Sequence, residues 1–168
     1  IKNTEYSLGD LLRDSKLAAK FRGGQAFIFR LTPSHYHRYC HVAEGRVLCS
    51  RKIPGKLHCV RPIALETTPV FVQNSREYQV IRTREFATLV QMEVGALLVG
   101  KISNPPGTDR VRAGQEKGYF EFGGSTVILL VQKDAVQRSE KLFRRTAVDG
   151  EIPVKMGECI AVRRQTCP

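Results

Sequence analysis

The stretch YFEFGGSTVILL, residues 119–130, decides the fold, because two strand-like apolar runs meet in it at a pair of glycines. The run 127–131 is apolar throughout and has the length of a buried strand. Gly123 and Gly124 predict a tight turn or bulge before it. Glycine also tolerates the strained backbone that Ser125 would need to bring its hydroxyl back onto the preceding carbonyl. The stretch is therefore both a strand connection and a candidate point of self-cleavage.

Outward from this stretch, short strand candidates alternate with turn residues along most of the chain. They lie at residues 26–31, 46–50, 78–83, 87–94, 97–102, 119–122, 126–132 and 158–163. One helix is expected near the N-terminus, with Ser7 as its N-cap, Asp10 in capping-box position and Gly23-Gly24 at its end. The pattern predicts a mainly β (α+β) fold, a β-rich barrel or sandwich with one N-terminal helix, and a single domain over residues 1–168.

The chain is strongly basic, with 27 lysines and arginines against 16 aspartates and glutamates and a net charge of +11. Such an excess favours anionic partners. No nucleic-acid-binding motif accompanies the charge and aromatic residues are few, so nucleic acid is not an expected partner. An anionic membrane surface fits better. No apolar run reaches the length of a transmembrane helix.

The residues best suited to acid–base chemistry lie in HYHRYCH, residues 35–41. This segment holds three of the four histidines, whose imidazoles exchange protons near neutral pH. A metal site is not expected, because no carboxylate or second group of His and Cys at ligand spacing completes a shell. The five cysteines form no Cys-x-x-Cys pair, which favours reduced thiols over a disulfide framework or a zinc site.

Several sequence blocks, taken in order, resemble the phosphatidylserine decarboxylase family, in the branch whose cleavage motif reads Gly-Gly-Ser-Thr. The blocks are LTP at 31–33 with YHRYC at 36–40, PGKLH at 54–58 with RPIA at 61–64, NSREY at 74–78, VQMEVGA at 90–96, and KGYFEFGGST at 117–126. Any one of them alone would be a weak signal, but the whole series in this order is specific. The resemblance covers nearly the whole chain.

The resemblance implies a pyruvoyl enzyme that makes its own cofactor. In that family the serine hydroxyl, here Ser125, attacks the carbonyl of the preceding glycine, here Gly124, and turns the amide into an ester. The ester then eliminates, which leaves a long piece, 1–124, and a short piece, 125–168, with a pyruvoyl group in place of Ser125. The pyruvoyl ketone combines with the substrate amine and serves as an electron sink while carbon dioxide leaves. Phosphatidylserine would thus become phosphatidylethanolamine.

The resemblance also implies partners and a location. The two pieces are expected to stay together as a heterodimer, which could assemble further. The substrate is phosphatidylserine, and the enzyme is expected to sit peripherally on the cytoplasmic face of the cell membrane, with its basic residues against the anionic lipid surface.

The same resemblance assigns site residues and leaves one role open. His37 matches the histidine of the Tyr-His-Arg motif, and proton transfer during decarboxylation is its expected role. Many members carry a second histidine three residues further on, which activates the serine, but Cys40 stands in that slot here. The base could then be His41, His58 or neither. The candidate site residues are therefore Ser125, with Gly124 at the cleavage site, His37 and His41.

The beginning of the chain bears on the expected activity. The activating aspartate of the family lies upstream of the matching region, and the chain opens on Ile1, so it is expected to be N-terminally truncated. Poor self-cleavage of residues 1–168 alone is therefore predicted. Glu93 and Arg76, which lie within matching blocks, are expected to have salt-bridged structural roles.

Two other classes of function remain as alternatives. One is a non-catalytic carrier or binding module built as a lipoyl-like β-barrel, for which Lys155-Met156 is only a faint signal. The other is a pyruvoyl decarboxylase that acts on a soluble amino acid. Binding to lipid vesicles, lost at high salt, would separate the lipid enzyme from the soluble one.

Overall fold

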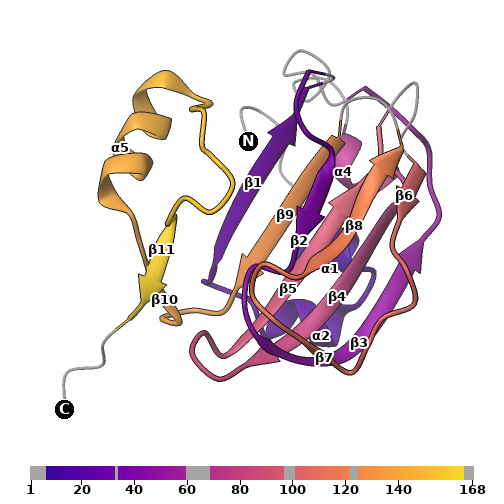
Figure 1. Ribbon diagram of the computed structural model, residues 1–168, viewed down its shortest axis with the longest axis horizontal. Coiled ribbons are helices and arrows are strands. Elements are labelled where there is room, and N and C mark those ends of the chain that lie inside the picture. Colours follow the sequence, from indigo (N-terminus) through magenta and orange to yellow (C-terminus); the bar gives the residue numbers. More distant parts are fainter. Residues whose placement is uncertain (1–6, 33, 60–68, 97–100, 122–124, 165–168) are drawn as a thin grey trace.

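A six-stranded antiparallel sheet forms the frame of the protein in a computed structural model that describes residues 7–32, 34–59, 69–96, 101–121 and 125–164 (Figure 1). In spatial order its strands are β1 (Gln25–Leu31), β9 (Ser125–Val131), β5 (Thr88–Val94), β4 (Arg76–Thr83), β3 (Gly45–Ile53) and β7 (Arg110–Val111). All seven residues of β9 are buried, as expected for the strand after the two glycines. It lies between β1 and β5, so both of its edges are hydrogen-bonded.

A second, three-stranded antiparallel sheet packs on one face of this frame. Its strands are β2 (Arg38–Cys40), β8 (Glu116–Glu121) and β6 (Lys101–Ser103), with β8 in the middle. Tyr39 and Phe120 from this sheet meet Val127 of β9 in a small apolar cluster. The two sheets therefore form a sandwich, and the mainly β (α+β) prediction is confirmed.

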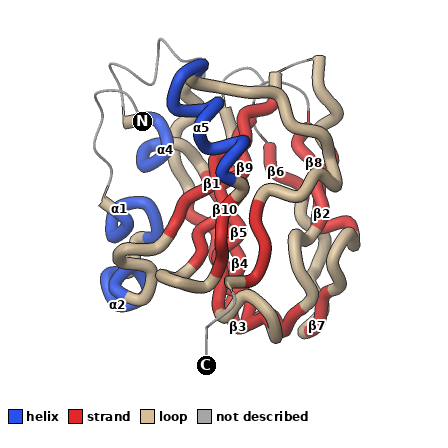
Figure 2. The backbone as a smooth tube through the Cα atoms, turned by 90° about the vertical axis from the view of Figure 1, so that its left-hand side faces the viewer, coloured by secondary structure: helices blue, strands red, loops and turns tan. Residues whose placement is uncertain are grey.

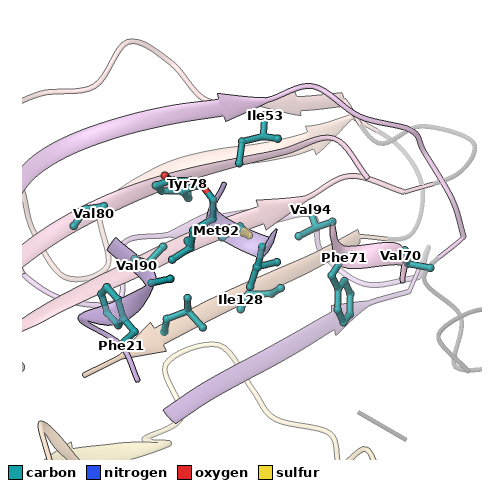
Figure 3. Packing of buried hydrophobic residues seen from close by; sticks show 14 of the residues in the cluster. Phe21, Ile53, Val70, Phe71, Tyr78, Val80, Val90, Met92, Val94 and Ile128 are labelled. Atoms are coloured by element: carbon teal, nitrogen blue, oxygen red, sulfur yellow. Dashed lines mark hydrogen bonds between the residues drawn. The ribbon is translucent and has the colours of Figure 1, made fainter. Parts of the chain in front are cut away.

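Short helices cover the other face of the six-stranded sheet (Figure 2). They are α1 (Leu8–Leu12), α2 (Ser15–Ala19) and α4 (Val70–Gln73). The largest apolar cluster lies between them and the sheet, where Phe21 and Phe71 pack with Met92 and Ile128 (Figure 3). Because side chains alternate along a strand, β5 and β9 send Met92 and Ile128 to this face and the residues beside them to the sandwich.

The expected N-terminal helix is instead two helices. Ser7 caps the first as predicted, with its hydroxyl oxygen accepting from the amide of Asp10 at 2.9 Å. Arg13 then adopts a left-handed conformation (φ 47°), which ends α1. Asp14 caps α2 by accepting from the amide of Leu17 at 2.8 Å. An aspartate favours a cap over a helix interior, so it divides a segment whose apolar spacing suits one helix.

An arm at the C-terminal end of the chain was not predicted as such. It consists of the two-stranded sheet of β10 (Val136–Arg138) and β11 (Ala161–Arg163), with the helix α5 (Glu140–Asp149) between them. Ser139 caps α5. The helix stands beside the sandwich, on the side of β1 (Figure 1). From the sequence, only one strand was predicted here, at residues 158–163.

Candidate active site

Ser125 opens β9 and is completely buried. Its partner on β1 is Leu31, the last residue of that strand. The hydroxyl oxygen of Ser125 has no hydrogen-bond partner among the described residues, although burial of an unpaired hydroxyl is unfavourable. Gly123 and Gly124, and with them the bond predicted to break, lie outside the described residues.

Strand geometry decides which layer each hydroxyl faces. Ser125 shares its face of β9 with Val127, which contacts the three-stranded sheet. Thr126 lies on the opposite face, shared with Ile128, next to the helices. Both hydroxyls are buried and lack a partner within the part of the chain that the structure describes, but of the two only that of Ser125 is directed into the sandwich.

His37 lies at the same end of the sandwich as Ser125. It immediately precedes β2, and its carbonyl accepts a hydrogen bond from the amide of Phe120 at 3.0 Å. Since β8 ends at Glu121 and β9 begins four residues later, the segment beside His37 leads directly to Ser125. In Figure 1 the end of β8 and the beginnings of β2 and β9 lie at the same edge of the sheets. The Nε2 atom of His37 is buried and has no hydrogen-bond partner in the described ranges.

The structure does not bring His41 to Ser125. The amide of His41 donates to Gln115 at 2.8 Å, at the far end of the β2–β8 pair. The side chain of Gln91 holds the backbone on both sides of His41, and Gln91 pairs with Leu129. Leu129 is four residues from Ser125, about 13 Å at the usual rise of a strand.

The environment of His41 keeps its imidazole neutral. The residue is 4% exposed, and its Nδ1 atom has no hydrogen-bond partner among the residues that the structure describes. Burial, and then the positive charge of Lys117, lower the pKa of His41 to about 4. A histidine in this state is an unprotonated side chain at neutral pH, but it lies away from the serine.

His58, the other open candidate, lies nearer to the start of β9. Its amide and carbonyl both bind the side chain of Asn74, at 2.9 and 2.8 Å. Asn74 also donates to the carbonyl of Gly95 at 2.7 Å. Gly95 follows Val94, the β5 partner of Thr126, so His58 is tied to the edge at which Ser125 begins its strand. Its Nε2 atom is buried and, as far as the structure describes the chain, has no hydrogen-bond partner.

Charged and polar side chains fill the sandwich beside the serine. We call Tyr39, Glu77, Glu93, Asn104 and Lys117 the polar layer. Glu93 and Lys117 form an ion pair in which the side chains are 0% and 1% exposed. Asn104 donates to Glu77 at 3.0 Å and to Glu93 at 3.3 Å, and it accepts from the hydroxyl of Tyr39 at 2.9 Å. Glu93 pairs with Val127, two residues from Ser125 on the same face.

Burial dominates the electrostatics of this layer. It raises the pKa of Glu93, and the charge of Lys117 and the hydrogen bonds from Lys117 and Asn104 oppose that rise. Burial and the nearby charge of Glu93 raise the pKa of Tyr39 as well. Tyr39 is therefore a neutral hydrogen-bond donor to Asn104 over the ordinary pH range.

The polar layer was only partly predicted from the sequence. The salt-bridged role predicted for Glu93 is confirmed. The same role predicted for Arg76, which is not part of the polar layer, is wrong, because among the described residues its guanidinium binds backbone carbonyls instead. Lys117 was not singled out. A glutamate within the buried strand TLVQMEV requires a counter-charge, and that requirement was the available signal.

No three His, Cys, Asp or Glu side chains lie together as metal ligands in the part of the chain that the structure describes. Within the same residues, no helix combines the length and the apolar character needed to cross a bilayer.

Comparison with known proteins identifies the family of this chain. The profile of the phosphatidylserine decarboxylase family matches residues 1–162. The chain is 44% identical to phosphatidylserine decarboxylase proenzyme 2 of Clostridium acetobutylicum over 160 residues, which are 95% of this chain and 55% of the relative. It is 40% identical over 163 residues to a phosphatidylserine decarboxylase proenzyme of Ruminiclostridium cellulolyticum, covering 95% and 54% of the two chains.

A third relative has a similar identity and coverage. The chain is 41% identical over 162 residues to a phosphatidylserine decarboxylase proenzyme of Clostridium perfringens, covering 95% of this chain and 55% of the relative. The chain thus spans about half the length of the curated relatives it matches. The family profile extends across the candidate site, including Ser125 and His37. This chain belongs to the phosphatidylserine decarboxylase family.

Proposed function

We propose that the protein is a pyruvoyl-dependent decarboxylase that converts phosphatidylserine to phosphatidylethanolamine and carbon dioxide after cleaving itself at the bond before Ser125. The observation that carries this proposal is the buried, unpartnered hydroxyl of Ser125 at the first residue of β9, with the free Nε2 atom of His37 at the same end of the sandwich. A hydroxyl that is held out of water and unpaired is available to a neighbouring carbonyl. Relatives named proenzymes support processing of this kind.

The residues fit a pyruvoyl group formed at Ser125. When present, that group would supply a carbonyl that bonds the substrate amine and accepts the electron pair left by carbon dioxide. The buried position of Ser125 would exclude water from the departing carboxylate, whose loss of charge is favoured in a dry site. His37 would deliver the proton that replaces the carboxylate, through the imidazole nitrogen that has no other partner.

The pairing of β9 supports a stable complex of the two pieces. After cleavage, β9 would belong to the short piece, 125–168, while both of its neighbours, β1 and β5, would belong to the long one. Breaking one peptide bond before Ser125 leaves both ladders of hydrogen bonds and the buried face of β9 in place. The pieces are therefore expected to remain together as a heterodimer that separates only under denaturing conditions.

The C-terminal arm supplies a surface suited to an anionic membrane. Three basic residues of α5, Lys141, Arg144 and Arg145, are exposed. Phe143 and Val148 on the same helix are 45% and 85% exposed. Exposed basic and apolar side chains on one helix favour anionic lipid, at about 1 kcal/mol for each well-placed cation. We propose that this arm holds the enzyme peripherally on the cytoplasmic face of the cell membrane.

Intact mass spectrometry of the full-length protein tests the reaction. The native protein should give two pieces, the shorter one beginning with a pyruvoyl group, and Ser125→Ala should give one. A native polypeptide that stays in one piece and still decarboxylates lipid would contradict the proposal. Activity on free serine but not on phosphatidylserine would favour the soluble amino-acid alternative.

A further inference from the structure

The interior of the sandwich contains a buried ion pair at a place where apolar side chains could pack instead. Glu93 and Lys117 have essentially no exposed side-chain surface. Removing two charges from water is costly, and apolar replacements of a buried ion pair are often as stable or more stable. Stability alone therefore gives little reason for this pair.

A backbone irregularity directs Lys117 into the interior. In the β2–β8 ladder Tyr39 pairs with Gly118, but Cys40 pairs with Glu116, so Lys117 is an extra residue without a partner across the ladder. Such a bulge redirects the side chain at the extra position. The amine of Lys117 thus reaches Glu93 on the opposite sheet instead of solvent.

The polar layer is a directional link between the two sheets. Apolar packing between them near Ser125 involves a small set of buried side chains, Tyr39, Phe120 and Val127. Hydrophobic contact has no direction and does not fix how one sheet sits on the other. The hydrogen bonds of Lys117 and Asn104 to Glu93 do fix the position of one sheet on the other. They join β8, and the residue after β6, to β5. Tyr39, two residues from His37, joins the same network through Asn104.

We infer that Glu93, Lys117 and Asn104 are positioning residues for the chemistry at Ser125: they hold the three-stranded sheet, and with it the end of β8 that leads to Ser125, in register over β9. The inference rests on the proposed function and adds residues to that site. It assigns to the buried pair a role in geometry that apolar side chains of similar size would not fill.

The test compares stability with the rate of self-cleavage in the full-length precursor. The double variant Glu93→Leu/Lys117→Met removes both charges and leaves no unpaired ion behind. Its melting temperature should equal or exceed that of the native precursor. Its first-order rate of cleavage, followed by intact mass at a temperature well below melting, should fall about a hundredfold, as for a misplacement of about 1 Å.

A neighbouring residue provides the matched control. Met92 lies next to Glu93 on β5, is completely buried, and belongs to the cluster on the helix side of the sheet. Met92→Ala should lower the melting temperature but leave the cleavage rate of the folded precursor within about threefold of native, because it leaves the polar layer intact. If the ion pair has a merely structural role, the ranking in melting temperature is reversed. The double variant then has the lower melting temperature of the two, and its folded precursor cleaves at the native rate.

The possible outcomes separate the inference from the proposed function. A stable double variant that cleaves at the native rate overturns the inference while the function stands. A native precursor that never cleaves overturns the function. If the double variant does not fold, Tyr39→Phe decides, since it removes only the hydroxyl bound to Asn104: slower cleavage supports the inference, and native cleavage overturns it.

Discussion

The carbonyl of His37 and the amide of Phe120 are joined by a hydrogen bond of 3.0 Å, which extends the β2–β8 ladder by one residue beyond Arg38. That bond places the histidine beside the strand whose end leads to Ser125. The position of His37 in the sandwich thus depends on pairing between two segments that are far apart in the sequence.

His37→Gln should therefore separate the two reactions of the protein. The variant keeps the backbone bond to Phe120 but loses the imidazole, so we expect two pieces of normal mass and a decarboxylation rate that is lower by about 10²- to 10⁴-fold. Mass spectrometry and release of carbon dioxide from phosphatidylserine measure the two outcomes. Decarboxylation at the native rate in this variant would remove His37 from the proposed site.

Ser125→Ala should block cleavage without cost to the fold. The native hydroxyl is buried and lacks a partner, so its removal deletes an unsatisfied polar atom and leaves only a small void. We expect a single uncleaved chain whose midpoint in urea equals or exceeds that of an uncleaved native precursor. A markedly lower midpoint would mean that the hydroxyl makes a stabilising contact, in conflict with its environment in the structure.

Much of the fold follows from local sequence, because β9 and the strands beside it carry their own pattern. The uninterrupted apolar run of β9 predicted a strand buried on both faces, and alternation predicted β1. Ser125, the proposed cleavage residue, and His37 were both found from sequence motifs, which need no structure. The inward turn of Lys117 was not predictable in this way, since it depends on a bulge between β2 and β8, two segments distant in sequence.

The contacts of Arg76 are a second feature that local sequence did not predict. Its place within a matching sequence block was interpreted as a salt-bridged structural role. The partners are instead the carbonyls of Asp10 and Leu11 at the end of α1, and those of Val72 and Asn74 around the end of α4. The unpaired carbonyls at a helix end are acceptors that no pattern of charged residues reveals.

Arg76→Met should consequently be among the most damaging single changes on the helix side of the sheet. It would leave four carbonyl groups without their donor, at a total cost of about 3 to 5 kcal/mol in the free energy of unfolding. Burial lowers the pKa of Arg76 to about 10, so the side chain stays charged at neutral pH. Urea unfolding measures the loss. Arg164→Met, which removes an exposed partner of Asp134, is the control and should cost less than about 1 kcal/mol.

The buried imidazole of His41 should make stability depend on pH. Burial lowers the pKa of His41 from the ordinary 6.5 to about 4 in the folded protein, so between these values the unfolded chain binds a proton that the folded one does not. The free energy of unfolding should therefore fall as the pH drops from 6.5 towards 4, by at most about 3 kcal/mol. The difference between native and His41→Gln unfolding curves across this range isolates the contribution. Parallel curves would contradict it.

Binding to anionic vesicles should depend on the basic residues of α5. The triple variant Lys141→Gln/Arg144→Gln/Arg145→Gln removes three exposed charges, worth about 1 kcal/mol each at an anionic surface, so binding should weaken by about two orders of magnitude. Co-sedimentation with phosphatidylserine-containing vesicles measures the effect, and vesicles of phosphatidylcholine alone set the baseline.

A matched variant, Arg46→Gln/Arg51→Gln/Arg82→Gln, removes the same charge from exposed positions of β3 and β4. If both variants lose binding equally, the attraction comes from net charge. If only the α5 variant loses binding, and added salt removes the rest, the arm is the surface that meets the lipid.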